Sequence, residues 1–185
     1  YSWWMKEKGN VKLSKYFTTF FGNYITAFRV AKRIKEFNND IIHTNSSVSN
    51  IGGLISKLTG IPHVWHIREF GKEDYNLDFL YGEKYAMKFM DKYSSQIIAI
   101  SNAIYEKYKD YFGNKLIVVY NGISKNYINT KQGGVEKDPI NLLLAGSIMP
   151  GKGQLDAVMA VKHIIDSGYT NIHLNIAGSI KNKEY

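Results

Sequence analysis

Residues 141–156 read NLLLAGSIMPGKGQLD, which is a short apolar run, a glycine-rich loop and the beginning of an amphipathic pattern. The apolar run at 142–145 predicts a buried strand. Residues 154–167 predict a helix with one apolar face, because their large apolar residues recur at helical spacing. That face would hold Leu155, Val158, Val161 and Ile165. A strand joined to a helix by so short a loop is typical of an α/β fold.

The same alternation extends toward the N-terminus and, by one strand, toward the C-terminus. Most of the apolar runs are continuous, as expected for parallel strands that are covered on both faces. We therefore predict a Rossmann-like, doubly wound parallel sheet flanked by helices, with right-handed crossovers. The further strands are predicted at 41–45, 64–68, 97–101, 116–120 and 172–177, and the further helices at 24–37, 48–58, 79–93 and 102–112.

A polar stretch at 129–139, NTKQGGVEKDP, interrupts this alternation and indicates a linker. It would divide the chain into a partial N-terminal domain, 1–128, and a second domain that begins at 140 and reaches 185. One strand–helix–strand unit is too small to bury both faces of a parallel sheet. We therefore expect the second domain to be truncated, with self-association or local disorder after Asn129.

Composition excludes several classes of site. The chain has no cysteine, so disulfides, thiolate nucleophiles and cysteine-based zinc sites are absent, and its five histidines are not spaced as a metal site. Histidines other than His66 are interpreted as core residues or have no partner that the sequence identifies. No run is long and apolar enough to span a membrane. A reducing, cytoplasmic location is the simplest expectation.

The net charge of +8 is concentrated at the front of the chain, where residues 1–40 hold eight Lys/Arg and three Asp/Glu. Such a basic, aromatic segment suits anionic lipid headgroups, a nucleotide-linked substrate or a plain solvated surface. Nucleic acid is not expected as a partner, since no helix-turn-helix, RNP or zinc-finger pattern accompanies the charge.

The loop from Gly146 to Gly153 is a candidate diphosphate-binding site. Residues 149–152 suit a type II turn, and Gly153 allows close backbone approach just where the helix N–H groups begin. Lys152 adds a positive charge. The alternative is an ordinary turn with a surface lysine, because neither the P-loop spacing nor the G-x-G-x-x-G fingerprint is present.

A second group of candidates follows the predicted strands of the first domain. His66, Arg68 and Glu69 fall at the carboxyl end of one strand, where open α/β sheets bind ligands. Arg68 would pair with an anionic group, and Glu69 would orient Arg68. Asn45 could hydrogen-bond a ligand hydroxyl, and the Asn121-Gly122 turn lies where the chain leaves the first domain. The alternative interpretations are that His66 is a core histidine, that Arg68 and Glu69 form a local surface pair, and that Asn121-Gly122 is an ordinary turn.

The segment LLLAGSIMPGKGQLDAV, residues 142–158, resembles the start of the C-terminal domain in retaining GT-B glycosyltransferases of the family 4 type. Gly146, Lys152 and Gly153 match that family's pattern. Ser147 stands where the family usually has arginine, and Gly151 where it usually has glutamate. The family's arginine and lysine hold the donor diphosphate, so Ser147 removes one of the two charges. Donor binding here would be weaker or would use another cation.

The resemblance covers roughly residues 40–178. The motifs DIIHTN at 40–45, IPHVWH at 61–66 and VVYNGI at 118–123 resemble successive strands of the family's N-terminal domain. The resemblance implies that His66 is a catalytic residue of the interdomain cleft, facing the donor sugar or the acceptor. It also makes Asn45, Asn121 and Gly122 cleft or acceptor candidates. Gly146, Ser147, Lys152 and Gly153 would bind the donor phosphates.

The implied reaction moves a sugar from a nucleoside-diphosphate sugar to an acceptor hydroxyl, with retention and without a metal or other cofactor. The acceptor would be a saccharide or lipid-linked, in cell-surface polysaccharide or glycolipid synthesis, at the inner face of the membrane or elsewhere in the cytoplasm. The family's glycine-rich acceptor loop and Glu-x7-Glu segment have no match here, so we expect this chain alone to be inactive. The alternatives are a catalytically inactive nucleotide- or phosphate-binding module and a membrane-surface scaffold.

Overall fold

The computed structural model describes residues 1–7, 9–125, 139–149 and 151–180. The chain forms two compact units, Tyr1–Ile123 and Ser124–Tyr185, and each is considered by itself. The predicted linker at 129–139 lies almost wholly outside the described residues, so the predicted domain boundaries stay predictions.

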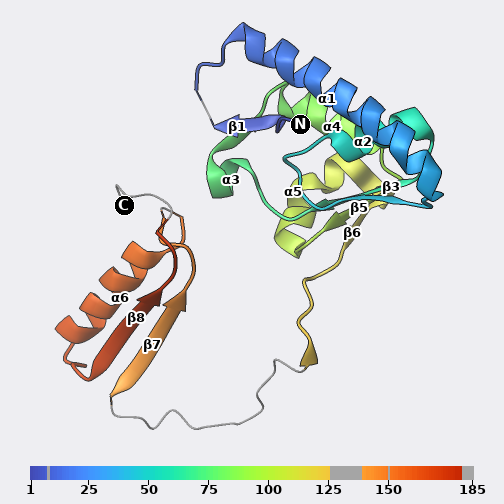
Figure 1. Cartoon of the computed structure of the whole chain (residues 1–185). Helices are drawn as coiled ribbons and strands as arrows, with labels where there is room; N and C mark the ends of the chain where they lie inside the picture. Colours follow the sequence, from blue (N-terminus) through green and yellow to red (C-terminus); the bar gives the residue numbers. More distant parts are fainter. Residues whose placement is uncertain (8, 126–138, 150, 181–185) are drawn as a thin grey trace. The chain divides into compact units, whose positions relative to one another are not determined.

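Unit 1 contains a four-stranded parallel sheet with the order β2-β3-β5-β6 and a short antiparallel pair, β1 with β4 (Figure 1). This confirms the predicted α/β fold with a parallel sheet flanked by helices. In chain order the elements are β1 (Met5–Glu7), α1 (Leu13–Ile34), the 3-10 turn η1 (Lys35–Phe37), β2 (Ile42–Thr44), α2 (Ile51–Thr59), β3 (His63–Ile67), α3 (Lys72–Tyr75), β4 (Leu77–Phe79), α4 (Glu83–Lys92), β5 (Gln96–Ala99), α5 (Asn102–Phe112), the 3-10 turn η2 (Gly113–Lys115) and β6 (Leu116–Val118).

Local signals set two of the helix ends. The Ser101 hydroxyl accepts a hydrogen bond from Ile104 N–H and caps α5, and Gly60 ends α2 with a φ of 77°. Residues 79–93 do not form one helix, however. Phe79 belongs to β4, and Gly82, with a φ of 84°, separates that strand from α4.

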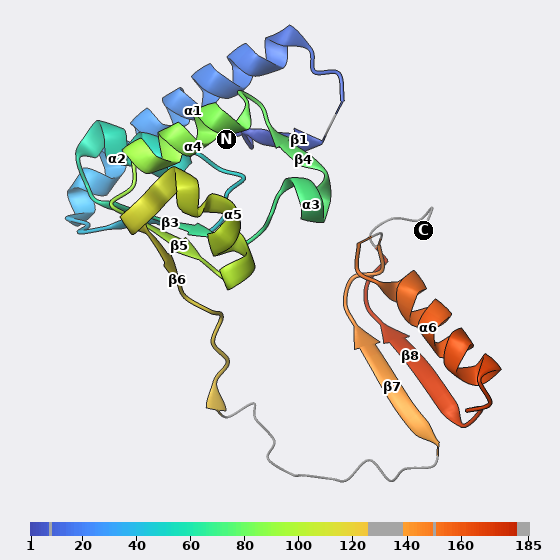
Figure 2. The same cartoon turned by 180° about the vertical axis from the view of Figure 1, so that it is seen from behind.

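The two faces of the sheet differ. Trp65, Ile97 and Leu116 point to one face and are buried, and α1, α2, α4 and α5 lie on that side (Figures 1 and 2). On the opposite face His43 and Ile117 are exposed and His66 is half-buried. The sequence predicted helices on both faces of the sheet. In the described part of unit 1, helices cover only one face.

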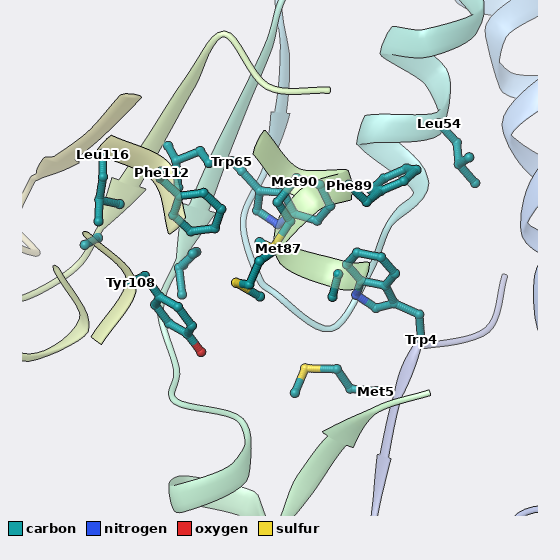
Figure 3. Packing of buried hydrophobic residues seen from close by; sticks show 14 of the residues in the cluster. Trp4, Met5, Leu54, Trp65, Met87, Phe89, Met90, Tyr108, Phe112 and Leu116 are labelled. Carbon is teal, nitrogen blue, oxygen red and sulfur yellow. The ribbon is translucent and has the colours of Figure 1, made fainter. Parts of the chain in front are cut away.

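An aromatic cluster forms the centre of the core (Figure 3). The Trp4 ring stacks on Trp65 with centroids 5.8 Å apart and meets Phe89 edge-on at 5.4 Å. Trp4 Nε1–H donates to the Ser47 carbonyl over 2.7 Å, so the N-terminal segment is tied to the loop after β2. Burying two indoles and a phenyl ring removes a large apolar area from water and stabilises unit 1.

Helix α1 begins at Leu13, well before the predicted residue 24. Its buried residues are Thr19, Asn23, Ala27 and Ala31, which are small or polar. Phe28, predicted to face inward, is exposed. The helical spacing had grouped Phe28 with Tyr24, Ala27, Ala31 and Ile34 on one face. Those four are buried or pack against the core, so the predicted face was wrong only at Phe28.

His63, predicted as a core residue, is fully buried on β3. Its Nδ1–H donates to the Tyr93 carbonyl over 2.9 Å, and its Nε2 accepts from the Thr44 hydroxyl over 2.7 Å. This pairing holds the ring in one neutral tautomer. Burial lowers the pKa of His63, although the hydrogen bond to Tyr93 works in the opposite direction.

The lowered pKa of His63 predicts that the stability of unit 1 depends on pH. Unfolded His63 takes up a proton near its ordinary pKa of about 6.5, whereas folded His63 does so only at lower pH. The free energy of unfolding should therefore fall below pH 6.5, by up to ~1.4 kcal/mol per pH unit for each such histidine. Urea unfolding between about pH 7.5 and about pH 5 measures it, above the range where carboxylates titrate. A flat profile, or an unchanged slope in His63→Gln, would contradict the assignment.

Unit 2 is a β-α-β unit of β7 (Ile140–Ala145), α6 (Gln154–Asp166) and β8 (Ile172–Ala177), with the strands parallel and in register from Ile140↔Ile172 to Ala145↔Ala177. Among its described residues Gln154 alone is buried. Leu155 and Val158 were predicted to face inward but are largely exposed, since one helix on two strands encloses little volume. Self-association of this chain stays a prediction.

No helix of the described residues is long and apolar enough to cross a membrane.

Candidate functional site

Three polar side chains meet at the carboxyl edge of the sheet in unit 1. Asn45 follows β2, Arg68 follows β3 and Asn121 lies beyond β6. Arg68 Nη1–H donates to Asn45 Oδ1 over 3.3 Å, and Arg68 Nη2–H donates to Asn121 Oδ1 over 3.1 Å. The structure thus brings together three of the residues predicted from separate motifs.

Arg68 is held in place but keeps binding capacity. A guanidinium carries five N–H donors, and the two amide oxygens use one on each terminal nitrogen. Among the described residues no carboxylate pairs with it, and the side chain is exposed. An anion could therefore bind to the remaining donors without breaking the amide contacts.

His66 lies on β3, on the less covered face of the sheet. Its ring stacks on His43 with centroids 5.8 Å apart and planes 28° apart. His66 Nε2 is buried and has no hydrogen-bond partner among the described residues. Burial lowers the pKa of His66, and Arg68 and His43 lower it further, against a smaller opposing effect of Glu69. The lowered pKa favours the neutral imidazole at pH 7.

His43 had been interpreted as a core residue, and this was wrong. Its register partner is Val64, so it points to the less covered face and is exposed. In a strand successive side chains alternate between faces, and a three-residue strand gives too little pattern to identify the inner one.

Glu69 does not orient Arg68 as predicted. Its Oε1 accepts hydrogen bonds from Ser46 Oγ at 2.7 Å, Ser47 N at 2.6 Å and Ser47 Oγ at 2.8 Å. The Trp65 indole N–H also donates to the Ser46 carbonyl over 2.9 Å. Glu69 thus fixes the loop that carries Asn45, and acts on Arg68 only through that loop.

Gly122 follows Asn121 and is exposed. A Cβ at this position would meet no atom within 4 Å, so the structure shows no close approach that requires glycine. Nothing in unit 1 gives Gly122 a ligand role of its own.

A cavity of about 250 Å³ lies beside α3, β4 and α5, and Asn45, Arg68 and Asn121 are not among its lining residues. Lys107 lies on its wall and pairs with Glu73 over 2.7 Å. The Lys107 ammonium also lies 5.3 Å from the ring centroids of Phe70 and Tyr108. Lys72 also lines the cavity, but so do the carboxylates of Glu73, Asp78 and Glu83. Because Lys107 is already paired and carboxylates outnumber lysines in the lining, this cavity is a poorer anion site than the edge at Arg68.

In unit 2 the glycine-rich loop joins the ends of both strands. The sequence Ala-Gly-Ser-Ile begins at the last residue of β7, at 145–148, and again at the last residue of β8, at 177–180. Gly146 N–H donates to the Ala177 carbonyl and Ile148 N–H to the Ser179 carbonyl, each over 2.9 Å. A Cβ on Gly178 would lie 1.7 Å from the Gly146 carbonyl oxygen. Only glycine at 178 lets the two loops lie this close.

The loop ends at the N-terminus of α6. Gly153 occupies the N-cap position with a φ of 75°, and no side chain caps the helix. Gln154 Nε2–H donates to the Ser147 carbonyl over 2.9 Å, which fixes the start of the loop against the helix. Exposed Lys152 stands beside the uncapped N–H groups. Of the predicted turn at 149–152, Pro150 is outside the described residues; Gly151 has a φ of 82°, and Lys152 N–H donates to the Met149 carbonyl over 3.2 Å.

The model of the family described as Glycosyltransferase Family 4 matches residues 11–127, which is more than half of the chain. The chain belongs to glycosyltransferase family 4. The resemblance seen in the sequence is thereby confirmed.

Individual proteins are similar to this family 4 chain in sequence or in fold. An uncharacterized glycosyltransferase of Methanocaldococcus jannaschii is 27% identical over 143 residues, which are 76% of this chain and 39% of the relative. The structure of Anabaena HepE in complex with UDP and glucose is similar with a TM-score of 0.62 and 19% identity, over 85% of this chain and 44% of HepE. The structure of HepE in complex with UDP is similar with a TM-score of 0.56 and 18% identity, over 81% of this chain and 51% of HepE. The chain thus spans between 39% and 51% of the length of these proteins.

Sequence reasoning missed the two serines that bind Glu69, and Gly178. An Asn-Ser-Ser run after a strand carries no signal that a carboxylate 22 residues away will bind it. Gly178 did have a signal, since the repeated Ala-Gly-Ser-Ile marks equivalent positions on two paired strands.

Proposed function

We propose that the protein transfers a sugar from a nucleoside-diphosphate sugar to an acceptor hydroxyl, with retention at the anomeric carbon. The observation that carries the proposal is the edge of unit 1, where Asn45 and Asn121 hold Arg68 near neutral His66, in a chain of glycosyltransferase family 4. Since the chain spans only part of its relatives, the proposal concerns the full-length gene product.

In unit 2, Gly146, Ser147, Lys152 and Gly153 are proposed to bind the donor diphosphate. The departing diphosphate carries growing negative charge, and stabilising it is an electrostatic task. The uncapped N-terminus of α6 and the Lys152 ammonium supply positive potential at one place. Ser147 offers a hydroxyl where the family pattern has an arginine, so Lys152 is the main charged contact. We propose that no metal or other cofactor is needed.

In unit 1, His66 is proposed to face the reacting sugar, and Arg68 an anionic group of the acceptor. A neutral imidazole can accept or donate one hydrogen bond to a sugar hydroxyl. A guanidinium with unused donors suits the phosphate of a lipid-linked acceptor. Such an acceptor belongs to cell-surface polysaccharide or glycolipid synthesis, at the cytoplasmic side of the membrane.

Arg68→Gln is expected to lower kcat/KM of the full-length gene product about 10- to 100-fold, because a charged hydrogen bond to the acceptor is lost. Asn121→Ala removes one of the two contacts that position Arg68 but removes no charge, so it should lower kcat/KM less than Arg68→Gln does. Steady-state kinetics with a lipid-linked acceptor measures both. If Arg68→Gln were as active as wild type, Arg68 would not be part of the acceptor site.

A second candidate is a catalytically inactive nucleotide- or phosphate-binding module, which Ser147 in place of arginine favours. Calorimetry of the full-length gene product with UDP- and GDP-sugars, followed by a turnover assay with lipid-linked acceptors, separates the two. HepE was crystallised with UDP-glucose, so that donor is tried first. Binding followed by sugar transfer supports the enzyme. Binding without turnover of any donor supports the module.

A further inference from the structure

The cavity beside α3, β4 and α5 contains a buried hydroxyl group. Tyr108 lines this cavity and keeps only 2% of its surface exposed, and its hydroxyl forms no hydrogen bond with another described residue. Figure 3 shows the hydroxyl oxygen directed away from Phe112 and toward the side of Met5, which lines the same cavity. Because a buried polar group without a partner costs free energy, this hydroxyl is a ready contact for a ligand.

The electrostatic potential at this hydroxyl is negative. The pKa of Tyr108 is raised, first by burial and then by the charges of Glu83, Glu73 and Glu69. A potential that disfavours the phenolate also attracts a cation, whereas a neutral polyol gains nothing from it. Glu73 already pairs with Lys107, but Glu83 forms no ion pair with another described residue.

One ammonium group of the protein already uses this environment. Lys107 Nζ lies 2.7 Å from a Glu73 carboxylate oxygen and 5.3 Å from the ring centroids of Phe70 and Tyr108. Aromatic faces attract cations through the ring quadrupole, and a carboxylate beside them adds a charged hydrogen bond. The wall of the cavity therefore has the chemistry that an ammonium ion requires.

The rest of the lining can hold a second ammonium group. Asp78 and Glu83 form no ion pair with another described residue, and the remaining lining cation, Lys72, is exposed. The volume of about 250 Å³ suits a ligand smaller than a drug-sized molecule. The apolar part of the lining is formed by Met5, Phe70, Leu77 and Phe79.

We propose that this cavity binds a small organic ammonium ion, whose N–H groups donate to the Glu83 carboxylate and to the Tyr108 hydroxyl oxygen. The carbon skeleton of the ligand would pack on the apolar lining. This inference does not rest on sugar transfer.

NMR titration of the 185-residue chain, labelled with ¹³C in its methionine methyl groups, tests the proposal. The two probes are cyclohexylamine, which is an ammonium ion at about pH 7, and cyclohexanol, which has the same ring without the charge. Cyclohexylamine should shift the Met5 signal saturably, because Met5 lines the cavity, and should leave that of Met159 on α6 unchanged. Cyclohexanol should bind about tenfold more weakly or not at all.

Two variants remove the proposed polar contacts. Glu83→Gln should weaken binding of cyclohexylamine about tenfold, and Tyr108→Phe, which keeps the ring, should weaken it about threefold. Glu106→Gln and Tyr111→Phe remove the same groups from exposed positions of α5 outside the lining, and should bind like wild type. Circular dichroism and urea unfolding check that every variant is folded.

The full-length gene product provides the last control. Calorimetry should give it the same affinity for cyclohexylamine as the 185-residue chain. Loss of binding there would show that another segment of the gene product fills the cavity, and would overturn the proposal. So would an unshifted Met5 signal, equal binding of cyclohexanol, or wild-type affinity in both Glu83→Gln and Tyr108→Phe.

Discussion

Gly52→Ala is expected to destabilise unit 1 by about 2–5 kcal/mol. A Cβ at this position would lie 1.9 Å from Thr44 Oγ1 and 2.8 Å from His63 Nε2. Thr44 can move away only by giving up its hydrogen bond to His63. The substitution therefore both overpacks the contact between α2 and the sheet and leaves a buried ring nitrogen without a partner.

Gly22→Ala is the matched control. Gly22 lies within α1 and is exposed, and a Cβ there would meet no atom within 4 Å. Alanine at this position should therefore stabilise the helix by about 0.5–1 kcal/mol. Urea unfolding of the wild type and both variants measures the difference. If Gly52→Ala were as stable as Gly22→Ala, the close contact of α2 with Thr44 and His63 would be wrong.

Lys152→Gln is expected to weaken binding of a nucleoside-diphosphate sugar to the full-length gene product about 10- to 100-fold. A hydrogen bond to a charged group contributes ~1.5–3 kcal/mol, and no second arginine or lysine is present between Gly146 and Gly153 to replace it. The α6 N-terminus would remain and retain part of the affinity. Calorimetric titration with UDP-glucose, or with whichever donor binds wild type, measures the change.

Lys162→Gln is the control for this change, because Lys162 lies on the same helix. Its partner is Asp166, in an exposed pair one turn apart, so its loss should alter donor affinity and stability little. Equal donor affinity of Lys152→Gln and Lys162→Gln would show that the loop is an ordinary turn and that the donor phosphates bind elsewhere.

The sequence predicted the edge of the sheet better than the contacts made there. Asn45, Arg68 and Asn121 could be grouped because each follows an apolar run, and the ends of parallel strands meet at one edge. The hydrogen bonds that join them depend on side-chain reach across strands, which local spacing does not reveal. The same limit explains Glu69, whose partners belong to the loop of a different strand.

Helix α1 shows a second limit of prediction from the sequence, which concerns the buried face of a helix. Periodicity locates an apolar face but does not say whether protein or another phase covers it. In α1 the protein packs on Thr19, Asn23 and Ala27, and the phenylalanines remain outside. In helices α2 and α4 the apolar residues at helical spacing do face the core, since Ile55 and Met90 are buried.

The most direct test of sugar transfer is the anomeric configuration of the product. The full-length gene product is incubated with a donor that binds it and a lipid-linked acceptor, and NMR follows the anomeric proton. We predict release of the nucleoside diphosphate and a glycoside with the anomeric configuration of the donor. A product of inverted configuration, or a bound donor that stays intact with every acceptor tried, would contradict the proposed function.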